Sequence, residues 1–162
     1  MGSRWASPAW PPLAAALVAT LVAGRPAAAQ RVRELGVIGI ATASDPALVV
    51  GGVYAALRTS LRTRVSADAG VGTSDGKTAW RGELLAHFLL SPTRRDGPGF
   101  YGASGVAVVG GPVKQGYVVV TLGLEARPGA RAGWFVEAGF GGGARLAAGY
   151  RWRRPPPGWP IP

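Results

Sequence analysis

The sequence contains no cysteine among its 162 residues and has only one histidine and one methionine. Without cysteine the chain can form no disulfide scaffold and no thiolate metal site, and it has no cysteine nucleophile. The single histidine, His87, also excludes a histidine-rich metal cluster. We therefore expect no metal ion and no other cofactor.

Acidic residues are few as well. Eight Asp and Glu residues stand against eighteen Lys and Arg residues, which gives a formal net charge of +10. Such a surplus can attract nucleic acids or anionic surfaces. The cations are almost all arginine, however, and they are scattered along the chain instead of clustered with aromatic residues, so we expect no nucleic-acid partner.

Residues 1–29 have the features of a secretory signal peptide. Arg4 supplies a positive charge, residues 13–24 are apolar, and Ala27-Ala28-Ala29 provides small residues at the expected cleavage site. The apolar run is shorter than the roughly 20 residues that a helix needs to span a bilayer. A membrane anchor remains the alternative to cleavage after Ala29.

The rest of the chain has the pattern of strands and not of helices. Glycine recurs every few residues, and Val, Thr, Tyr and Trp fill the segments between turn signals. The expected strands are 33–42, 48–59, 61–73, 77–90, 99–109, 115–127, 131–141 and 144–153. Their short connections force each strand to run antiparallel to the one before it. The predicted fold is all-β, an eight-stranded antiparallel up-and-down barrel over residues 30–154, since closure removes both sheet edges.

Most of these strands alternate between an apolar face and a polar face. In the fourth, Trp80, Leu84 and Phe88 share one face, whereas Arg81 and His87 share the other. The first strand does not choose a face clearly. The ionisable residues expected on the polar face are Arg64, Asp68, Arg81, Glu83, His87, Glu125, Glu137, Arg145, Arg151 and Arg153.

Alternation alone does not decide which face is inside. A lipocalin-type barrel turns its apolar face inward, whereas an outer-membrane barrel turns it toward lipid. The scarcity of lysine in the strands favours an apolar face turned toward lipid. The polar face carries charges of both signs separated by small residues, which suits a narrow lumen. Aromatic residues near the strand ends also favour lipid, because such rings form girdles at membrane interfaces. The expected girdle residues are Trp80, Phe88, Tyr101, Trp134, Phe140, Tyr150 and Trp152.

Charged residues inside such a barrel need partners. We expect Asp68 to lie directly or diagonally across from Arg81. The other expected interior acids are Glu83, Glu125 and Glu137, and the arginines available to pair with the acids are Arg62, Arg64, Arg81, Arg127, Arg145 and Arg151. The expected role is a structural network, with a proton or ion path through the lumen as the alternative.

The signal peptide, the eight alternating strands and the stretch Gly149-Tyr150-Arg151-Trp152 together resemble the small eight-stranded outer-membrane β-barrel proteins of Gram-negative bacteria, with an OmpA- or OmpX-like membrane domain. The resemblance implies a bacterial outer-membrane location, the lipid bilayer as partner, and insertion by the barrel-assembly machinery, which reads a terminal aromatic residue. The proline-rich tail at 155–162 departs from this pattern. It cannot extend the sheet, so we expect an extended periplasmic peptide, with a partner-binding segment as the alternative.

The expected function is that of a non-enzymatic outer-membrane barrel with a structural or narrow-pore role, a packed polar lumen and no small-molecule ligand. The alternative is a periplasmic or secreted lipocalin-like barrel that binds a small apolar ligand. His87 with Glu83 and either Ser66 or Ser104 could form a hydrolase triad. No local motif surrounds them, so we expect no catalytic residue.

Overall fold

The computed structural model describes residues 32–154, and the expected signal peptide (1–29) and proline-rich tail (155–162) lie outside the described residues. The described chain forms strands only. They are β1 (Arg33–Ala43), β2 (Leu48–Arg58), β3 (Thr63–Ser74), β4 (Lys77–Leu89), β5 (Pro98–Gly110), β6 (Gln115–Ala126), β7 (Ala132–Phe140) and β8 (Ala144–Arg154). The expected boundaries lie within two residues of these.

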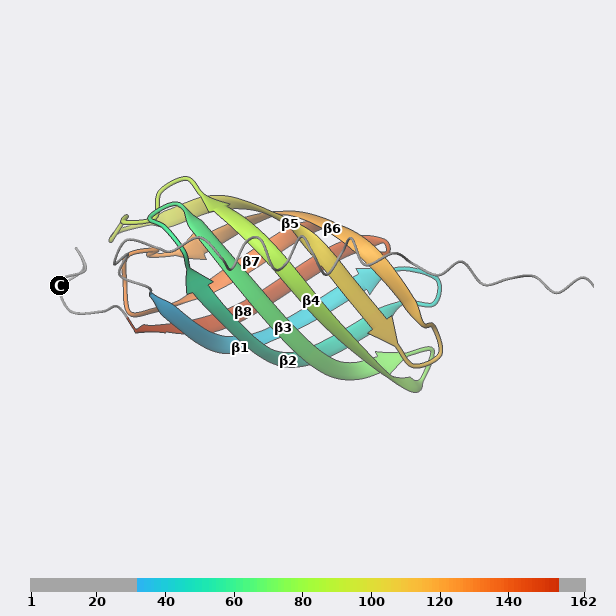
Figure 1. The fold of residues 1–162 in the computed structure, drawn as a ribbon. Helices are drawn as coiled ribbons and strands as arrows, with labels where there is room; N and C mark the ends of the chain where they lie inside the picture. The colour runs from blue at the N-terminus through green and yellow to red at the C-terminus, as the bar shows by residue number, and fades with distance from the viewer. Residues whose placement is uncertain (1–31, 155–162) are drawn as a thin grey trace, which may run out of the picture.

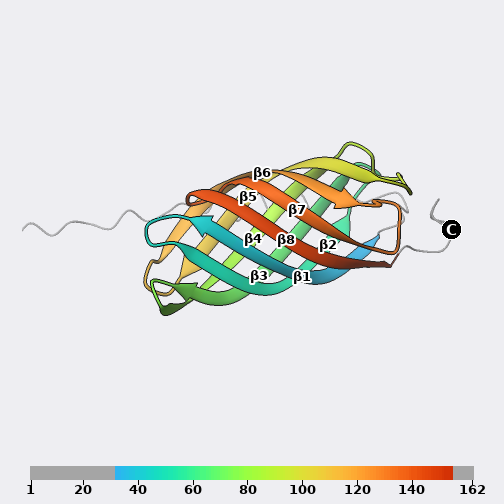
Figure 2. The same cartoon turned by 180° about the vertical axis from the view of Figure 1, so that it is seen from behind.

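Each strand pairs antiparallel with the next, and β8 pairs with β1 to close the barrel. The strands run obliquely around the barrel, as the front and back views show (Figures 1 and 2). The predicted eight-stranded up-and-down barrel is therefore confirmed. Across residues 32–154 no helix is long and apolar enough to cross a membrane.

The two ends of the barrel are distinguished by the strand order. β1 begins and β8 ends at the same end (Figure 1), which we call the terminal end. The loops 59–62, 90–97 and 127–131 lie there, and the loops 44–47, 75–76, 111–114 and 141–143 lie at the opposite, distal end. The tightest loop is Asp75-Gly76, in which both residues have positive φ values of 51° and 67°, as a two-residue hairpin requires.

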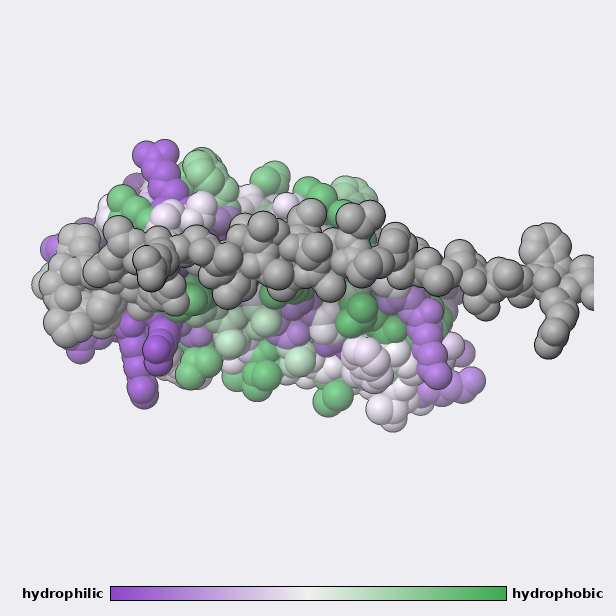
Figure 3. All heavy atoms as spheres, in the orientation of Figure 1, coloured by the Kyte–Doolittle hydropathy of each residue, from purple (hydrophilic) through white to green (hydrophobic). Residues whose placement is uncertain are grey.

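The interior of the barrel is largely charged and its exterior is largely apolar. Along β4, Arg81, Glu83 and His87 are buried, whereas Trp80 and Phe88 are about half exposed, at 48% and 50%. The space-filling view shows hydrophilic side chains gathered toward the two ends, with apolar and neutral side chains between them (Figure 3). The largest apolar exposures are those of Leu122, Val118, Phe140, Val71, Val53 and Leu146.

The first strand, whose faces the sequence leaves open, follows the same alternation. Leu35 and Val37 point outward, while Ile38 and Ile40 are buried. These two isoleucines belong to a cluster of buried apolar side chains inside the barrel. Its other members are Leu48, Val50, Tyr54, Ala79, Phe135 and Ala147. The interior is therefore not uniformly polar.

Large inward side chains lie against glycines of the neighbouring strand. A Cβ at Gly123 would stand 2.2 Å from Cζ of Tyr101, and a Cβ at Gly149 would stand 2.5 Å from Cζ of Phe135. Glycine at these inward positions leaves room for an aromatic ring over the backbone. This small-against-large arrangement fills the narrow lumen.

Candidate functional site

The barrel interior is the candidate site because it holds charged side chains from seven of the eight strands. The structure places every residue expected on the polar face inside the barrel. It adds two that sequence reasoning missed, Glu34 and Arg58. For Arg58 a signal existed, since Tyr54, Ala56 and Arg58 alternate in phase.

One group of ion pairs, the mid-barrel cluster, joins Arg81, Glu83, Glu137 and Arg145. Arg145 donates from Nε to Oε1 of Glu83 at 3.0 Å and from Nη2 to Oε2 at 2.7 Å. It also donates from Nη1 to Oε2 of Glu137 at 2.9 Å. Arg81 donates from Nε to Oε1 of Glu83 at 2.5 Å and from Nη2 to the carbonyl of Gly141 at 2.9 Å. Glu83 of β4 is thus tied to β8 across the lumen.

A second group, the terminal-end cluster, contains four arginines and two glutamates. Its members are Glu34, Arg58, Arg64, Glu125, Arg151 and Arg153. Arg58 pairs with Glu34 at 2.8 Å, and Arg64 reaches Glu34 at 3.4 Å and Glu125 at 3.2 Å. Arg151 also pairs with both carboxylates. The cluster therefore links strands β1, β2, β3, β6 and β8 and carries an excess of positive charge.

Tyr101 connects the two clusters. Its hydroxyl donates to Oε1 of Glu137 at 2.9 Å, and Cζ of Arg64 lies 4.9 Å from its ring centroid. The assignment of Tyr101 to an aromatic girdle is therefore wrong, because its side chain is only 1% exposed. The neighbouring Phe100 is 57% exposed and occupies the outward position instead. Glycines in this strand blur its alternation, so the sequence misassigns its faces.

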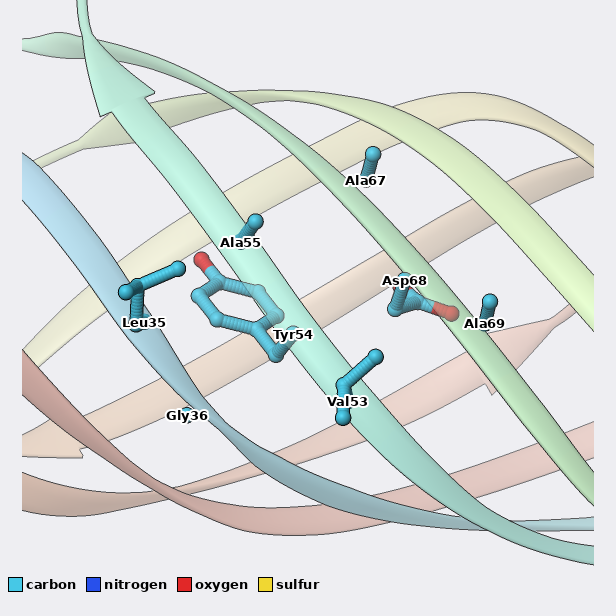
Figure 4. Close-up of a pocket in the computed structure, with 8 residues that line it drawn as sticks. All are labelled: Leu35, Gly36, Val53, Tyr54, Ala55, Ala67, Asp68 and Ala69. Carbon is cyan, nitrogen blue, oxygen red and sulfur yellow. The ribbon is translucent and has the colours of Figure 1, made fainter.

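The partner of Asp68 is the second correction. Asp68 lies directly across from Glu83, and Arg81, which faces Gly70, is its diagonal neighbour, as expected. Asp68 makes no ion pair or hydrogen bond with any residue of the described barrel, and its Oδ1 is buried. On the other side it neighbours Tyr54, and both residues border a shallow hollow between strands (Figure 4). The expected Asp68–Arg81 pair is absent because Arg81 instead binds Glu83.

Two of the arginines expected as lumen partners lie elsewhere. Arg62 and Arg127 are exposed in the loops of the terminal end. Their positions follow from the strand boundaries, since each stands just outside a strand and does not share the inward face. Arg58 and Arg153 pair with lumen carboxylates instead, Arg58 with Glu34 and Arg153 with Glu125.

The hydrogen bond between Ser66 and His87 has the wrong direction for a serine hydrolase. Nη2 of Arg64 lies 3.1 Å from Nδ1 of His87, and Oγ of Ser66 lies 2.7 Å from Nε2. Because a guanidinium only donates, Nδ1 must accept, so the neutral ring carries its proton on Nε2 and donates it to Ser66. A serine nucleophile needs the opposite, an Nε2 that accepts. Ser104 points outward, away from His87.

The terminal mouth is covered by two loops. Arg58 donates from Nη1 to the carbonyl of Pro92 and from Nη2 to that of Pro128, both at 3.1 Å. Arg153 donates to the carbonyl of Ala130 at 2.9 Å. The loops also bond to each other, from the amide of Gly129 to the carbonyl of Arg94 at 2.8 Å. Buried arginines thus hold the loops 90–97 and 127–131 over the lumen.

No cluster of acidic or histidine side chains suited to a metal ion occurs in the part of the chain that the structure describes. The interior offers guanidinium–carboxylate pairs that link strands across the lumen. Comparison with protein-family models finds no family that matches the chain, and a search of curated proteins finds no match.

Proposed function

We propose that this chain is a non-enzymatic outer-membrane β-barrel protein, with an apolar exterior in lipid and a packed charged interior that holds the barrel in shape. The observation that carries the proposal is the direction of the side chains. Leu122 is 75% exposed and Val118 is 73% exposed, whereas Arg64 and Arg151 are fully buried.

This distribution suits lipid better than water. An exterior that carries apolar side chains on strand after strand exceeds the apolar patch size usual for a protein in water. In a bilayer the same side chains contact acyl chains, and a closed barrel leaves no strand edge with unpaired backbone groups. The exposed aromatic residues lie toward both ends of the strands, where interfacial girdles are expected. They are Trp80, Phe88, Phe100, Trp134, Phe140, Tyr150 and Trp152.

Within this proposal the barrel is structural and not a general pore. Glu83 and Arg145 bridge β4 and β8, and Arg64 and Glu125 bridge β3 and β6, so side chains cross the lumen at two levels. Eight strands enclose only enough space for side chains to fill. The loops over the terminal mouth add a further obstruction. We expect no steady ion conductance from the intact barrel.

The resemblance to OmpA- and OmpX-like membrane domains supports the same proposal and supplies the bacterial outer membrane as its location. In that setting the terminal end faces the periplasm. The alternative, a lipocalin-like carrier, requires an apolar binding cavity inside the barrel. The interior positions of β3, β4 and β8 hold arginines and carboxylates instead, which disfavours an apolar ligand.

Fractionation of bacteria that express the full chain tests the proposal. We expect a mature product in the outer-membrane fraction, with a gel mobility that changes when the sample is boiled, as the barrel unfolds. A product recovered from the periplasm without detergent would overturn the membrane proposal and favour the carrier. A planar-bilayer recording of the purified barrel then separates a closed lumen from a narrow pore.

A further inference from the structure

Exposed charge differs sharply between the two ends of the barrel. The terminal end carries an arginine collar, which we define as Arg33, Arg62, Arg94, Arg95, Arg127, Arg131 and Arg154. The only exposed acid there is Asp96. At the distal end Lys77 and Lys114 are balanced by Asp45 and Asp75. The positive surface is therefore confined to one end.

The sequence supplies few acidic side chains to the surface of the terminal end. Of the eight acidic residues, five are buried in the lumen, and they are Glu34, Asp68, Glu83, Glu125 and Glu137. The residues outside 32–154 contain no Asp or Glu. Asp96 is thus the single carboxylate side chain available to the outer surface of the terminal end.

Arg33 and Arg154 form the most specific feature of the collar. They are direct cross-strand partners where β1 meets β8, and both are exposed. Like charges directly opposite each other destabilise a strand pair in water. Neither arginine forms an ion pair with any carboxylate of the described chain. An anion placed between the two guanidinium groups would remove the repulsion and accept hydrogen bonds from both.

The position of this arginine pair along the barrel axis indicates which anion would fit between the two guanidinium groups. On the outer face, the next pair toward the barrel centre is Leu35 opposite Trp152, and the one after it is Val37 opposite Tyr150. The rings of Tyr150 and Trp152 pack edge to face with centroids 5.2 Å apart. The two arginines therefore lie just beyond the apolar and aromatic surface, at the level where lipid phosphates border the acyl chains.

We propose that the Arg33–Arg154 pair, supported by the collar, binds the phosphate groups of anionic phospholipids and so holds the terminal end in an anionic leaflet. This inference rests on the proposed function, since it requires a barrel in lipid. A basic side chain near an anionic membrane surface gains about fivefold in affinity. Because the distal end has no such surplus, the lipid preference belongs to one leaflet.

The test uses the full mature chain reconstituted in vesicles of phosphatidylcholine and phosphatidylglycerol in equal amounts. The barrel is extracted in mild detergent, and the lipid that remains bound is measured by mass spectrometry. We expect enrichment of phosphatidylglycerol, reduced by about fivefold for each arginine removed in the double variant Arg33→Gln/Arg154→Gln. The matched control, Lys77→Gln/Lys114→Gln, removes the same charge from the distal end and keeps the enrichment.

Equal amounts of both lipids on the wild-type barrel, or an equal loss in the control variant, would overturn the inference. So would displacement of phosphatidylglycerol by inorganic phosphate at similar concentration, which indicates a site for free phosphate. The heat-dependent gel shift reports whether each variant has folded. If neither the wild-type barrel nor any variant inserts, whatever the lipid, the proposed membrane function itself is contradicted. That outcome is thereby distinguished from a failure of lipid selection.

Discussion

Arg145 donates two hydrogen bonds to Glu83, from Nε to Oε1 at 3.0 Å and from Nη2 to Oε2 at 2.7 Å, and so joins β8 to β4 across the lumen. Such a fork is the strongest geometry available to an arginine and a carboxylate. It lies among side chains with almost no solvent exposure, where an unpaired charge is costly.

Replacement of Glu83 by alanine is expected to lower the free energy of unfolding by about 3–5 kcal/mol, because Arg81 and Arg145 then lose their shared carboxylate in a buried site. Urea unfolding of the refolded barrel in detergent, followed by tryptophan fluorescence, measures the change. Lys77→Ala on the same strand is the control and changes stability by less than about 0.5 kcal/mol. Equal stability of the two variants would show that the network does not stabilise the fold.

Asp68→Asn is expected to have the opposite sign. Asp68 has no partner within residues 32–154 and faces the Glu83 carboxylate directly across the strand pair. Removing its charge relieves repulsion, so we expect stability to rise by about 1 kcal/mol in the same assay. A loss as large as that of Glu83→Ala would mean that Asp68 is paired in the folded barrel.

Gly123→Ala tests the packing of Tyr101. A Cβ at Gly123 would stand 2.2 Å from the ring, so the ring must move and lose its contact with Glu137. Overpacking of this kind costs about 1–3 kcal/mol. Gly116→Ala on the same strand is the control, since its nearest neighbour would be 3.8 Å away. If both variants unfold at the same urea concentration, Tyr101 does not fix the interior.

Arg58→Met tests the loops over the terminal mouth. Arg58 donates to the carbonyls of Pro92 and Pro128, and the variant leaves Glu34 with the other arginines of its cluster. Loss of two hydrogen bonds is expected to speed tryptic cleavage after Arg94 about tenfold. Lys114→Met in a distal loop should leave that rate unchanged. Cleavage at the wild-type rate in Arg58→Met would show that the arginine does not restrain the loops.

The number of strands and their order were predictable because turn residues interrupt the alternating segments at regular intervals. The interior faces of β3, β4 and β8 were predictable because each of these strands alternates charged with apolar residues. The face of Tyr101 was not, because glycines leave few side chains in β5 to mark the period. The unpaired state of Asp68 within residues 32–154 and the partners of Glu34 depend on register and on contacts across the lumen, which alternation within one strand does not encode.

The proposed membrane function requires that the apolar exterior contacts lipid. The chain contains no cysteine, so Leu122→Cys in the middle of β6 accepts a single environment-sensitive fluorophore, and Lys114→Cys in a distal loop is the control. In vesicles we expect that a quencher on the lipid acyl chain dims the label at position 122 and that aqueous iodide does not, with the reverse at position 114. Quenching of position 122 by iodide, with no effect of the acyl-chain quencher, would contradict a barrel that spans the membrane.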